Sequence, residues 1–394
     1  MTRSLRAKQF IPAVGLSMAA AIGLAACSSG AAGASSKPAK GKSANSSKPD
    51  KRKSSKRDKS SILTVEKPGP ATVAEAGSSL LYPLWNLWAP GYNQKYPQVT
   101  LDTAAGGSGK GISGATNGTL QIGSSDAYLS SAQKTASPTL LDIPLAISAQ
   151  EIYYNVTGVT AHLKLNGKIL AEMYTGKITK WNTSAIAKLN PGIALPALPV
   201  VTLHRIDGSG DTFLFTTYLS DSTKTWSSKV GYNTSVTWPS TPQELAETGN
   251  SGMVAGCQKT KGCIAYIGIS YQSQALGDGL TYSELENGNG QYVMPTAKTI
   301  QTEAAGFTKK TPATGAISMI DGKVKTGWPI INYEYAIVNK KQSTANEAKT
   351  VRSVLEWAID PEDGNSATYL SQVGFRPLPE KVVEQSYKQI KSIK

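Results

Sequence analysis

Short apolar runs of strand length alternate along this 394-residue chain with segments in which apolar residues recur at helical spacing. Such alternation is typical of α/β proteins, and it predicts an α/β fold. The predicted strands are Val99–Thr103, Gln121–Gly123, Ile143–Ile147, Val200–Leu203, Cys263–Ile267 and Ile330–Val338. The predicted helices are Leu80–Tyr96, Gly109–Asn117, Gly167–Thr175, Asp211–Leu219, Thr344–Ala358 and Lys381–Lys391.

Two prolines constrain the first predicted helix. Pro83 is compatible only with the first turn, so the helix is expected to begin near Ser79. Pro90 lies inside the same helix and removes a backbone donor, so we expect a kink or a split there.

The segment from Val201 to Leu219 combines a strand, a break of small residues and a helix. The strand ends near Arg205, the break is Asp207-Gly-Ser-Gly210, and the helix follows from about Asp211. The first N–H groups of a helix lack intrahelical acceptors, and the helix dipole favours negative charge beside them. Arg205 adds a planar fork of donors that suits an oxyanion. The segment therefore predicts an anion site, although Ser and Asp are also ordinary helix caps and an Arg after a strand is often a solvated charge.

Two further breaks have the same character. Ala76-Gly-Ser-Ser79 precedes the helix at Leu80, and Gly106-Gly-Ser-Gly109 precedes the helix at Gly109. With Ser209, this places three serine hydroxyls at helix N-termini. Each alone is a common cap, but three directed at one point would surround an anion with donors.

Residues 1–26 have the pattern of an export signal. A basic start with Arg3, Arg6 and Lys8 is followed by an apolar stretch from Phe10 to Leu24. Leu24-Ala-Ala-Cys27 fits the bacterial lipoprotein cleavage pattern, so Cys27 is expected to carry lipid; a plain secretory signal with an incidental cysteine is the alternative. No later apolar run is long enough to span a bilayer. We therefore expect a protein anchored by lipid to the extracytoplasmic face of the cell membrane.

Residues 27–61 form a Ser-, Ala-, Gly-, Lys- and Pro-rich tether that is expected to be disordered. The tether has ten basic and two acidic side chains, and residues 1–26 have three basic and no acidic ones. Only +3 of the formal net charge of +14 therefore belongs to residues 62–394. The charge is no evidence for nucleic-acid binding, whereas a basic tether beside a lipid anchor suits anionic lipid or cell wall.

Several enzyme motifs fail on inspection. Ala104–Gly111 resembles a P-loop, but it lacks the first glycine and the hydroxyl after Lys110. No G-x-S-x-G sequence occurs, and neither His162 nor His204 stands in a recognisable catalytic context. We expect no catalytic residues, no cofactor and no metal.

Cys257 and Cys263 are the cysteines that follow Cys27. Cysteines of exported chains are usually oxidised, so a disulfide between these two is expected. A metal pair is the alternative, although the spacing does not suit zinc and no histidine is nearby.

Four motifs in order carry a resemblance to a known family. They are Gly77-Ser-Ser-Leu-Leu-Tyr-Pro83, Gly107-Ser-Gly-Lys-Gly-Ile112, Gly123-Ser-Ser-Asp-Ala-Tyr-Leu-Ser130 and Arg205-Ile-Asp-Gly-Ser-Gly-Asp-Thr212. From about Ala74 to its end, the chain resembles the periplasmic phosphate-binding protein of the high-affinity phosphate ABC transporter, in the lipoprotein form found in actinobacteria.

The resemblance implies a phosphate site with eight contributing residues. Asp207 would orient the arginine, and other members often have Thr-Phe where this chain has Ser79-Leu80. Asp211 departs from the many members that have Thr there; it either shares the proton of the ligand or only caps the helix. The implied phosphate-binding residues are Ser79, Leu80, Ser108, Asp126, Arg205, Ser209, Gly210 and Asp211.

The implied fold is a two-lobed, hinged α/β binding protein. Lobe one would hold residues 62–146 and 325–394, lobe two would hold residues 147–324, and the hinge would lie near Leu145–Ala149 and Trp328–Ile331. Phosphate would bind in the cleft and close the hinge, and the permease of an ABC importer would recognise the closed form. A receptor for another oxyanion, or a surface phosphatase or other hydrolase, are the alternatives.

An ionised Asp126 would explain selectivity for phosphate. Phosphate keeps at least one proton at neutral pH and can donate it to a carboxylate, whereas sulfate has none. Bound sulfate would leave a buried lone pair facing a negative charge, which is costly.

Overall fold

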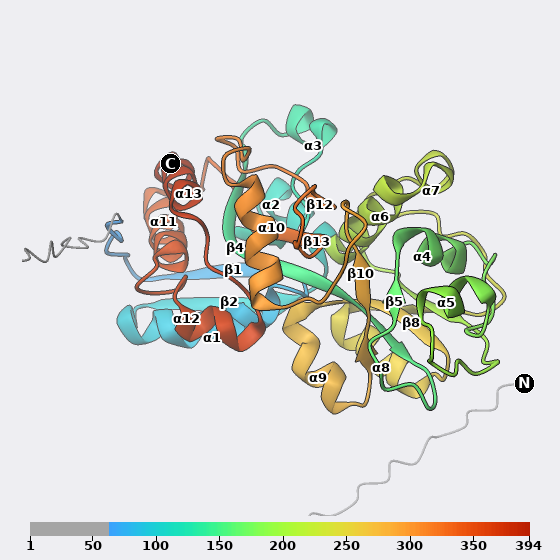
Figure 1. The fold of residues 1–394 in the computed structure, drawn as a ribbon. Helices are drawn as coiled ribbons and strands as arrows, with labels where there is room; N and C mark the ends of the chain where they lie inside the picture. Colours follow the sequence, from blue (N-terminus) through green and yellow to red (C-terminus); the bar gives the residue numbers. More distant parts are fainter. Residues whose placement is uncertain (1–62) are drawn as a thin grey trace, which may run out of the picture. The chain divides into compact units, whose positions relative to one another are not determined.

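The computed structural model describes residues 63–394. The expected signal peptide (1–26), the tether (27–61) and the lipid-bearing Cys27 lie outside the described residues. Within the described part, helices pack on a mixed sheet of ten strands, with order β2-β1-β3-β13-β4-β8-β6-β7 along its main path (Figure 1). The α/β prediction is therefore confirmed.

One half of this sheet begins with three parallel strands. They are β1 (Ala71–Gly77), β2 (Val99–Ala105) and β3 (Ile122–Ser125), connected by α1 (Tyr82–Lys95) and α2 (Ser108–Asn117). Parallel strands end at a common edge of the sheet. The turns that follow β1, β2 and β3 therefore lie side by side.

Strand β4 (Leu140–Asn155) runs through the centre of the sheet and changes partner along its length. As far as Ala149 it pairs antiparallel with β13 (Ile330–Asn339), and from Gln150 it pairs antiparallel with β8 (Cys263–Gly268). Beyond β8 lies β6 (Val201–Arg205), which pairs parallel with β8, and β7 (Glu244–Glu247) pairs parallel with β6 at the edge of the sheet. The break that follows β6 leads into α6 (Gly210–Ser222).

The remaining elements cover the two ends of the sheet. In Figure 1, α11, α12 and α13 lie beside α1 at one end, and α4, α5 and α7 lie at the other. The helices are α3 (Ser131–Ala136), α4 (Gly167–Tyr174), α5 (Ser184–Leu189), α7 (Lys224–Lys229), α8 (Gly249–Lys259), α9 (Gln272–Gly277), α10 (Ala297–Phe307), α11 (Ala345–Ile359), α12 (Ala367–Leu370) and α13 (Glu380–Lys391). The short strands are β5 (Lys164–Leu165), β9 (Thr281–Tyr282), β10 (Glu284–Glu286), β11 (Tyr292–Val293) and β12 (Met319–Ile320).

Helix α1 continues through Pro90, where the sequence predicted a kink or a split. Pro83 lies in its first turn as expected, but Pro90 does not split the helix, which continues to Lys95. Trp85, Trp88 and Tyr92 of this helix are all buried. Burial of three large aromatic side chains outweighs the loss of one backbone hydrogen bond.

A disulfide joins Cys257 of α8 to Cys263 of β8, with the two Cα atoms 5.3 Å apart. The predicted pairing is thereby confirmed. The bridge closes the short turn between α8 and β8, which fixes the C-terminal end of α8 against the sheet.

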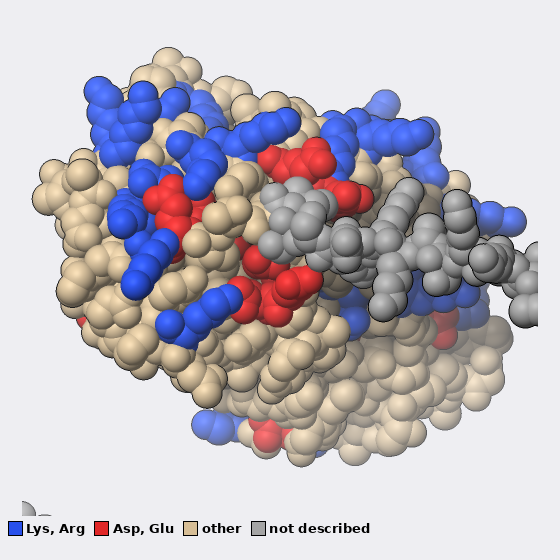
Figure 2. All heavy atoms as spheres, turned by 90° about the vertical axis from the view of Figure 1, so that its left-hand side faces the viewer, with Lys and Arg blue, Asp and Glu red and all other residues tan. Residues whose placement is uncertain are grey.

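Charges of both signs lie together on the face that carries α11 and α13. Arg352 and Lys391 both contact Glu66, with nitrogen–oxygen distances of 2.9 and 2.7 Å, and Lys391 also lies 2.9 Å from Glu356. Figure 2 shows basic and acidic side chains interspersed over the visible part of this face. No helix among residues 63–394 is long and apolar enough to cross a membrane.

Candidate functional site

Asp126 lies at the centre of a buried polar cluster at the ends of β1, β2 and β3. The hydroxyl of Ser78, in the turn after β1, donates to Asp126 Oδ1. Ser108, the first residue of α2, accepts from the backbone N–H of Asp126 at 3.1 Å, and its hydroxyl lies 3.4 Å from Asp126 Oδ2. All three side chains are buried. The three turns that the parallel strands place side by side thus meet at one carboxyl group.

Arg205, at the end of β6, approaches the same region with its guanidinium held on two sides. Its Nε donates to Asp207 Oδ1 at 2.6 Å and its Nη2 donates to Asp207 Oδ2. Its Nη1 donates to Asp211 Oδ2 at 3.0 Å. Burial opposes the charged form, but the hydrogen bonds to Asp207 and the charge of Asp211 keep the pKa of Arg205 above its usual value. Arg205 is therefore a fixed positive charge.

Asp211, the second residue of α6, is enclosed by donors. Gln150 Nε2 donates to its Oδ1 at 3.1 Å, and Asn250 Nδ2 donates to its Oδ2 at 2.7 Å, beside the contact with Arg205. Burial raises the pKa of Asp211, and the charge of Arg205 opposes that shift. The carboxylate thus holds the arginine in place, and it does more than cap the helix.

Close backbone approaches bring the α6 end of the cluster against the α2 end. The N–H of Gly109 donates to the carbonyl oxygen of Gly208 at 2.8 Å. A Cβ at Gly210 would lie 2.3 Å from Asp126 Oδ2 and 2.5 Å from Ser108 Oγ. Only glycine fits at Gly210 without displacing the polar groups of the opposite segment.

Backbone N–H groups near the starts of α1 and α6 favour anion binding at this site. Ser209 caps α6, and its hydroxyl accepts from the N–H of Thr212 at 3.2 Å. As in any helix, the N–H groups of Gly210 and Asp211 have no acceptor within α6. Among residues 63–394, no hydrogen-bond acceptor is found for the N–H groups of Ser79 and Leu80. These donors can serve an anion placed between Asp126 and Arg205.

Comparison with known proteins shows which family the chain belongs to. The family model described as a PBP superfamily domain matches residues 19–362. The phosphate-binding protein PstS of Xylella fastidiosa is 31% identical over 323 residues, covering 82% of this chain and 85% of that protein. That of Pasteurella multocida is 32% identical over 322 residues, covering 82% and 90%. The chain belongs to the PstS family of phosphate-binding proteins.

A solved structure supports the fold at lower sequence similarity. The high-affinity periplasmic phosphate-binding protein PfluDING, bound with phosphate, has a TM-score of 0.62 and 19% identity, covering 79% of this chain and 92% of that one. The predicted two-lobed periplasmic-binding-protein fold is thereby confirmed. The resemblance to this family that the four sequence motifs carried is confirmed as well.

Four residues of the Asp126–Arg205 cluster and its surroundings were missing from the sequence predictions. Ser78 donates to Asp126, while Ser79 Oγ accepts from the backbone N–H and the Nδ2 of Asn250 at 3.1 and 3.0 Å. The others are Asn250, Gln150 and Glu334. A signal for Glu334 existed, because a charged residue inside the otherwise buried run Ile330–Val338 needs a partner.

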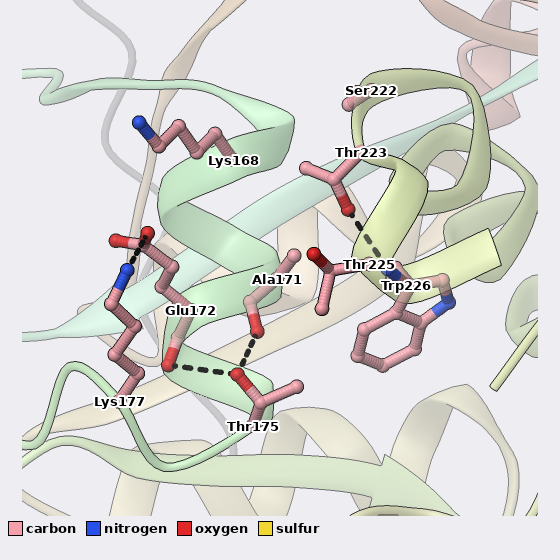
Figure 3. Close-up of a pocket in the computed structure, with 9 residues that line it drawn as sticks. All are labelled: Lys168, Ala171, Glu172, Thr175, Lys177, Ser222, Thr223, Thr225 and Trp226. Carbon is pink, nitrogen blue, oxygen red and sulfur yellow. Dashed lines mark hydrogen bonds and ion pairs between the residues drawn. The ribbon is translucent and has the colours of Figure 1, made fainter. Parts of the chain in front are cut away.

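The described residues also contain a surface pocket away from this cluster, with a volume of about 310 Å³ between α4 and α7. Several of its polar groups are engaged locally: Lys177 pairs with Glu172 at 2.5 Å, and the hydroxyl of Thr223 accepts from the N–H of Trp226 (Figure 3). No group in it resembles the donor set around Asp126. The Asp126–Arg205 cluster is therefore the candidate anion site of this PstS-family chain.

Proposed function

We propose that this chain is an extracytoplasmic substrate-binding protein that captures inorganic phosphate between its two lobes and delivers it to an ABC importer. The observation that carries the proposal is the meeting of Asp126 and Arg205 in one buried cluster ringed by helix N-termini. A binding role without catalysis fits a site built from a carboxyl, a guanidinium, hydroxyls and backbone donors.

Phosphate would satisfy both sides of this cluster at once. Its negative oxygens would accept from Arg205 and from the N–H groups of Ser79, Leu80 and Gly210, while its protonated oxygen would donate a hydrogen bond to Asp126. Ser108 and Ser209 would add hydroxyl groups. Binding in the micromolar range requires about 8 kcal/mol, which a few charge-assisted hydrogen bonds in a closed cleft can supply.

The hydrogen bonds of Asp211 suggest a supporting part in this scheme. Because its carboxylate already accepts from Arg205, Gln150 and Asn250, it would hold the guanidinium toward the ligand. Its own contribution to phosphate would be the backbone N–H at the start of α6. Asp207 would hold the opposite side of Arg205.

Capture would use a hinge at the strands that cross the middle of the sheet. The proposed lobes are residues 62–146 with 325–394, and residues 147–324. The change of partner of β4 between Ala149 and Gln150 supports a crossover there, and Trp328 Nε1 donates to the Gln150 carbonyl at 2.9 Å beside it. Contacts such as Gly109 to Gly208 would form when the lobes close.

The partner of the closed form would be the permease of a phosphate importer. A lipid on Cys27, after removal of residues 1–26, would keep the protein at the extracytoplasmic face of the cell membrane. The basic tether of residues 27–61 would let the binding lobes reach the transporter.

Calorimetric titration of ligand-stripped protein with phosphate tests the proposal. We expect saturable binding of one phosphate per chain. Absence of binding, together with saturable binding of another oxyanion such as sulfate or molybdate, would contradict the assignment of phosphate as the ligand.

A further inference from the structure

Glu334 is a buried acid whose contacts connect it to Asp126. It lies on β13, and its Oε1 accepts from Ser148 Oγ of β4 and from Asn332 Nδ2 at 3.1 Å. Its other oxygen, Oε2, has no donor among residues 63–394. Asp126 directly follows Ser125, the partner of Tyr335 in the pairing of β3 with β13, and Asn332 Nδ2 donates to the backbone carbonyl of Asp126, so the two acids lie on adjoining strands. Each carboxyl group shifts the pKa of the other. Two carboxyl groups buried beside each other are stable when a proton lies between them.

The surroundings of the two carboxyl groups decide which of them keeps the proton. Asp126 accepts from Ser78, lies beside the hydroxyl of Ser108 and is close enough to Arg205 to be stabilised by its charge. Glu334 has two neutral donors on one oxygen, and among the described residues the largest influences on its pKa include no cation. The charge is therefore more stable on Asp126, and the proton more stable on Glu334.

The electrostatics of the neighbouring groups agree with this order. Burial, and then the charge of Asp211, raise the pKa of Asp126 to about 7, while Arg205 opposes the shift. Burial, and then the charge of Asp126, raise the pKa of Glu334 well above its usual value. At neutral pH, Glu334 is the group that remains protonated.

We propose that Glu334 is a positioning residue that stays protonated and donates its hydrogen bond to Asp126, so that Asp126 remains an ionised acceptor for the proton of the bound oxyanion. This inference rests on the proposed function and identifies a specificity determinant within it. The ligand class is a tetrahedral oxyanion that carries at least one proton.

The arrangement has a consequence for selectivity. If the proton moved to Asp126, the acceptor would be neutral and would no longer repel an oxyanion without a proton. Glu334, fixed by Ser148 and Asn332 on the two central strands, prevents that transfer. Asn332 Nδ2 also donates to the backbone carbonyl of Asp126 at 3.3 Å, which fixes the relative position of the two acids.

Two variants distinguish the hydrogen bond that Glu334 donates from the space that its side chain fills. In Glu334→Gln, the amide nitrogen can donate to Asp126 and the amide oxygen can accept from Ser148 and Asn332, so affinity for phosphate should stay within about threefold of the wild type. Glu334→Met fills similar space but donates nothing, so affinity should fall about 10- to 100-fold and the preference for phosphate over sulfate should narrow. Equal loss in both variants would overturn the proposal, because it would mean that the carboxylate form is required.

Infrared spectroscopy of the ligand-free protein locates the proton directly. The difference spectrum of wild type minus Glu334→Gln should contain the band of one buried protonated carboxyl, over the unchanged bands of Glu75 and Glu151, and the difference spectrum of wild type minus Asp126→Asn should contain none. The reverse pattern would place the proton on Asp126 and overturn the inference. Because this measurement needs no ligand, it still decides the matter if the wild type fails to bind phosphate, which would instead refute the proposed function.

Discussion

Asp207 holds one edge of the Arg205 guanidinium with both of its carboxylate oxygens, with Nε donating to Oδ1 at 2.6 Å and Nη2 donating to Oδ2. Although burial alone would raise the pKa of Asp207, the hydrogen bonds and charge of Arg205 lower it. The pair remains charged at any physiological pH. It therefore presents the third nitrogen, Nη1, in a fixed direction beside Asp211.

Replacing Arg205 should weaken phosphate binding more than replacing Asp207, which holds it. Arg205→Lys loses the planar geometry and both contacts to Asp207, and affinity should fall about 30- to 100-fold, whereas Asp207→Asn should cost about tenfold. Calorimetric titration with phosphate measures both. Arg352→Lys, in the pair with Glu66 on another face, is the matched control and should leave the affinity unchanged. Equal effects at Arg205 and Arg352 would contradict the assignment.

The close approach of Asp126 to Gly210 leaves no room for a side chain at that position. Gly210→Ala would place a Cβ 2.3 Å from Asp126 Oδ2, so the carboxyl must move and phosphate affinity should fall by about tenfold or more. Gly277→Ala is the control, because a Cβ there meets nothing within 4 Å. Unaltered affinity in Gly210→Ala, with the variant folded, would show that Asp126 need not stay where it lies.

The disulfide should affect stability but not binding. Removing it in a Cys257→Ala, Cys263→Ala double variant relaxes the unfolded chain and should cost about 2–3 kcal/mol of unfolding free energy. Denaturant unfolding measures the loss, and reduction of the wild type should reproduce it. Phosphate affinity should stay the same, because the bridge lies at the end of α8 opposite Asn250. A large loss of affinity in the folded variant would contradict this separation.

Buried carboxyl groups should make the ligand-free protein less stable as pH rises. Burial raises the pKa of Asp126 to about 7 and the pKa values of Glu75 and Glu151 to about 8. Because the folded state then holds protons that the unfolded state has released, the free energy of unfolding should fall from about pH 5 to pH 8.

Denaturant unfolding across this pH range checks the sign of the effect. Glu151→Gln removes one titrating group, whose carboxyl contacts Tyr153 and Gln272, and should flatten the decline. Glu66 is a contrasting group, since the hydrogen bond from Arg352 lowers its pKa to about 2 and places its titration below the range. Stability that increases from pH 5 to pH 8 would be inconsistent with buried, protonated carboxyl groups.

The sequence indicated the local structure around Arg205 well. Arg205, Asp207, Ser209 and Gly210 follow one another through a strand end and a helix start, as their spacing predicted, while their contacts with phosphate stay a prediction. The α/β class followed from alternating periodicities for the same reason. Helix boundaries such as those of α2 and α13 fell within one residue of the prediction.

The residues that the sequence missed depend on contacts between distant segments. Asn250 reaches Ser79 across 171 positions, and no local pattern announces that contact. Strand β4 was predicted as Ile143–Ile147 but extends over Leu140–Asn155. The polar residues Ser148, Gln150 and Glu151 interrupt its apolar run, and they are tolerated because each has a hydrogen-bond partner from elsewhere in the fold.

Selectivity of Asp126→Asn tests the central claim most directly. Wild-type protein and the variant should be titrated with phosphate and with sulfate at pH 8, where Asp126 is ionised. The wild type is expected to bind phosphate and not sulfate, while the variant should lose phosphate affinity and gain measurable affinity for sulfate, because the repelling charge is gone. If the wild type bound sulfate as well as phosphate, or if the variant kept the wild-type preference, the proposed role of Asp126 would be wrong.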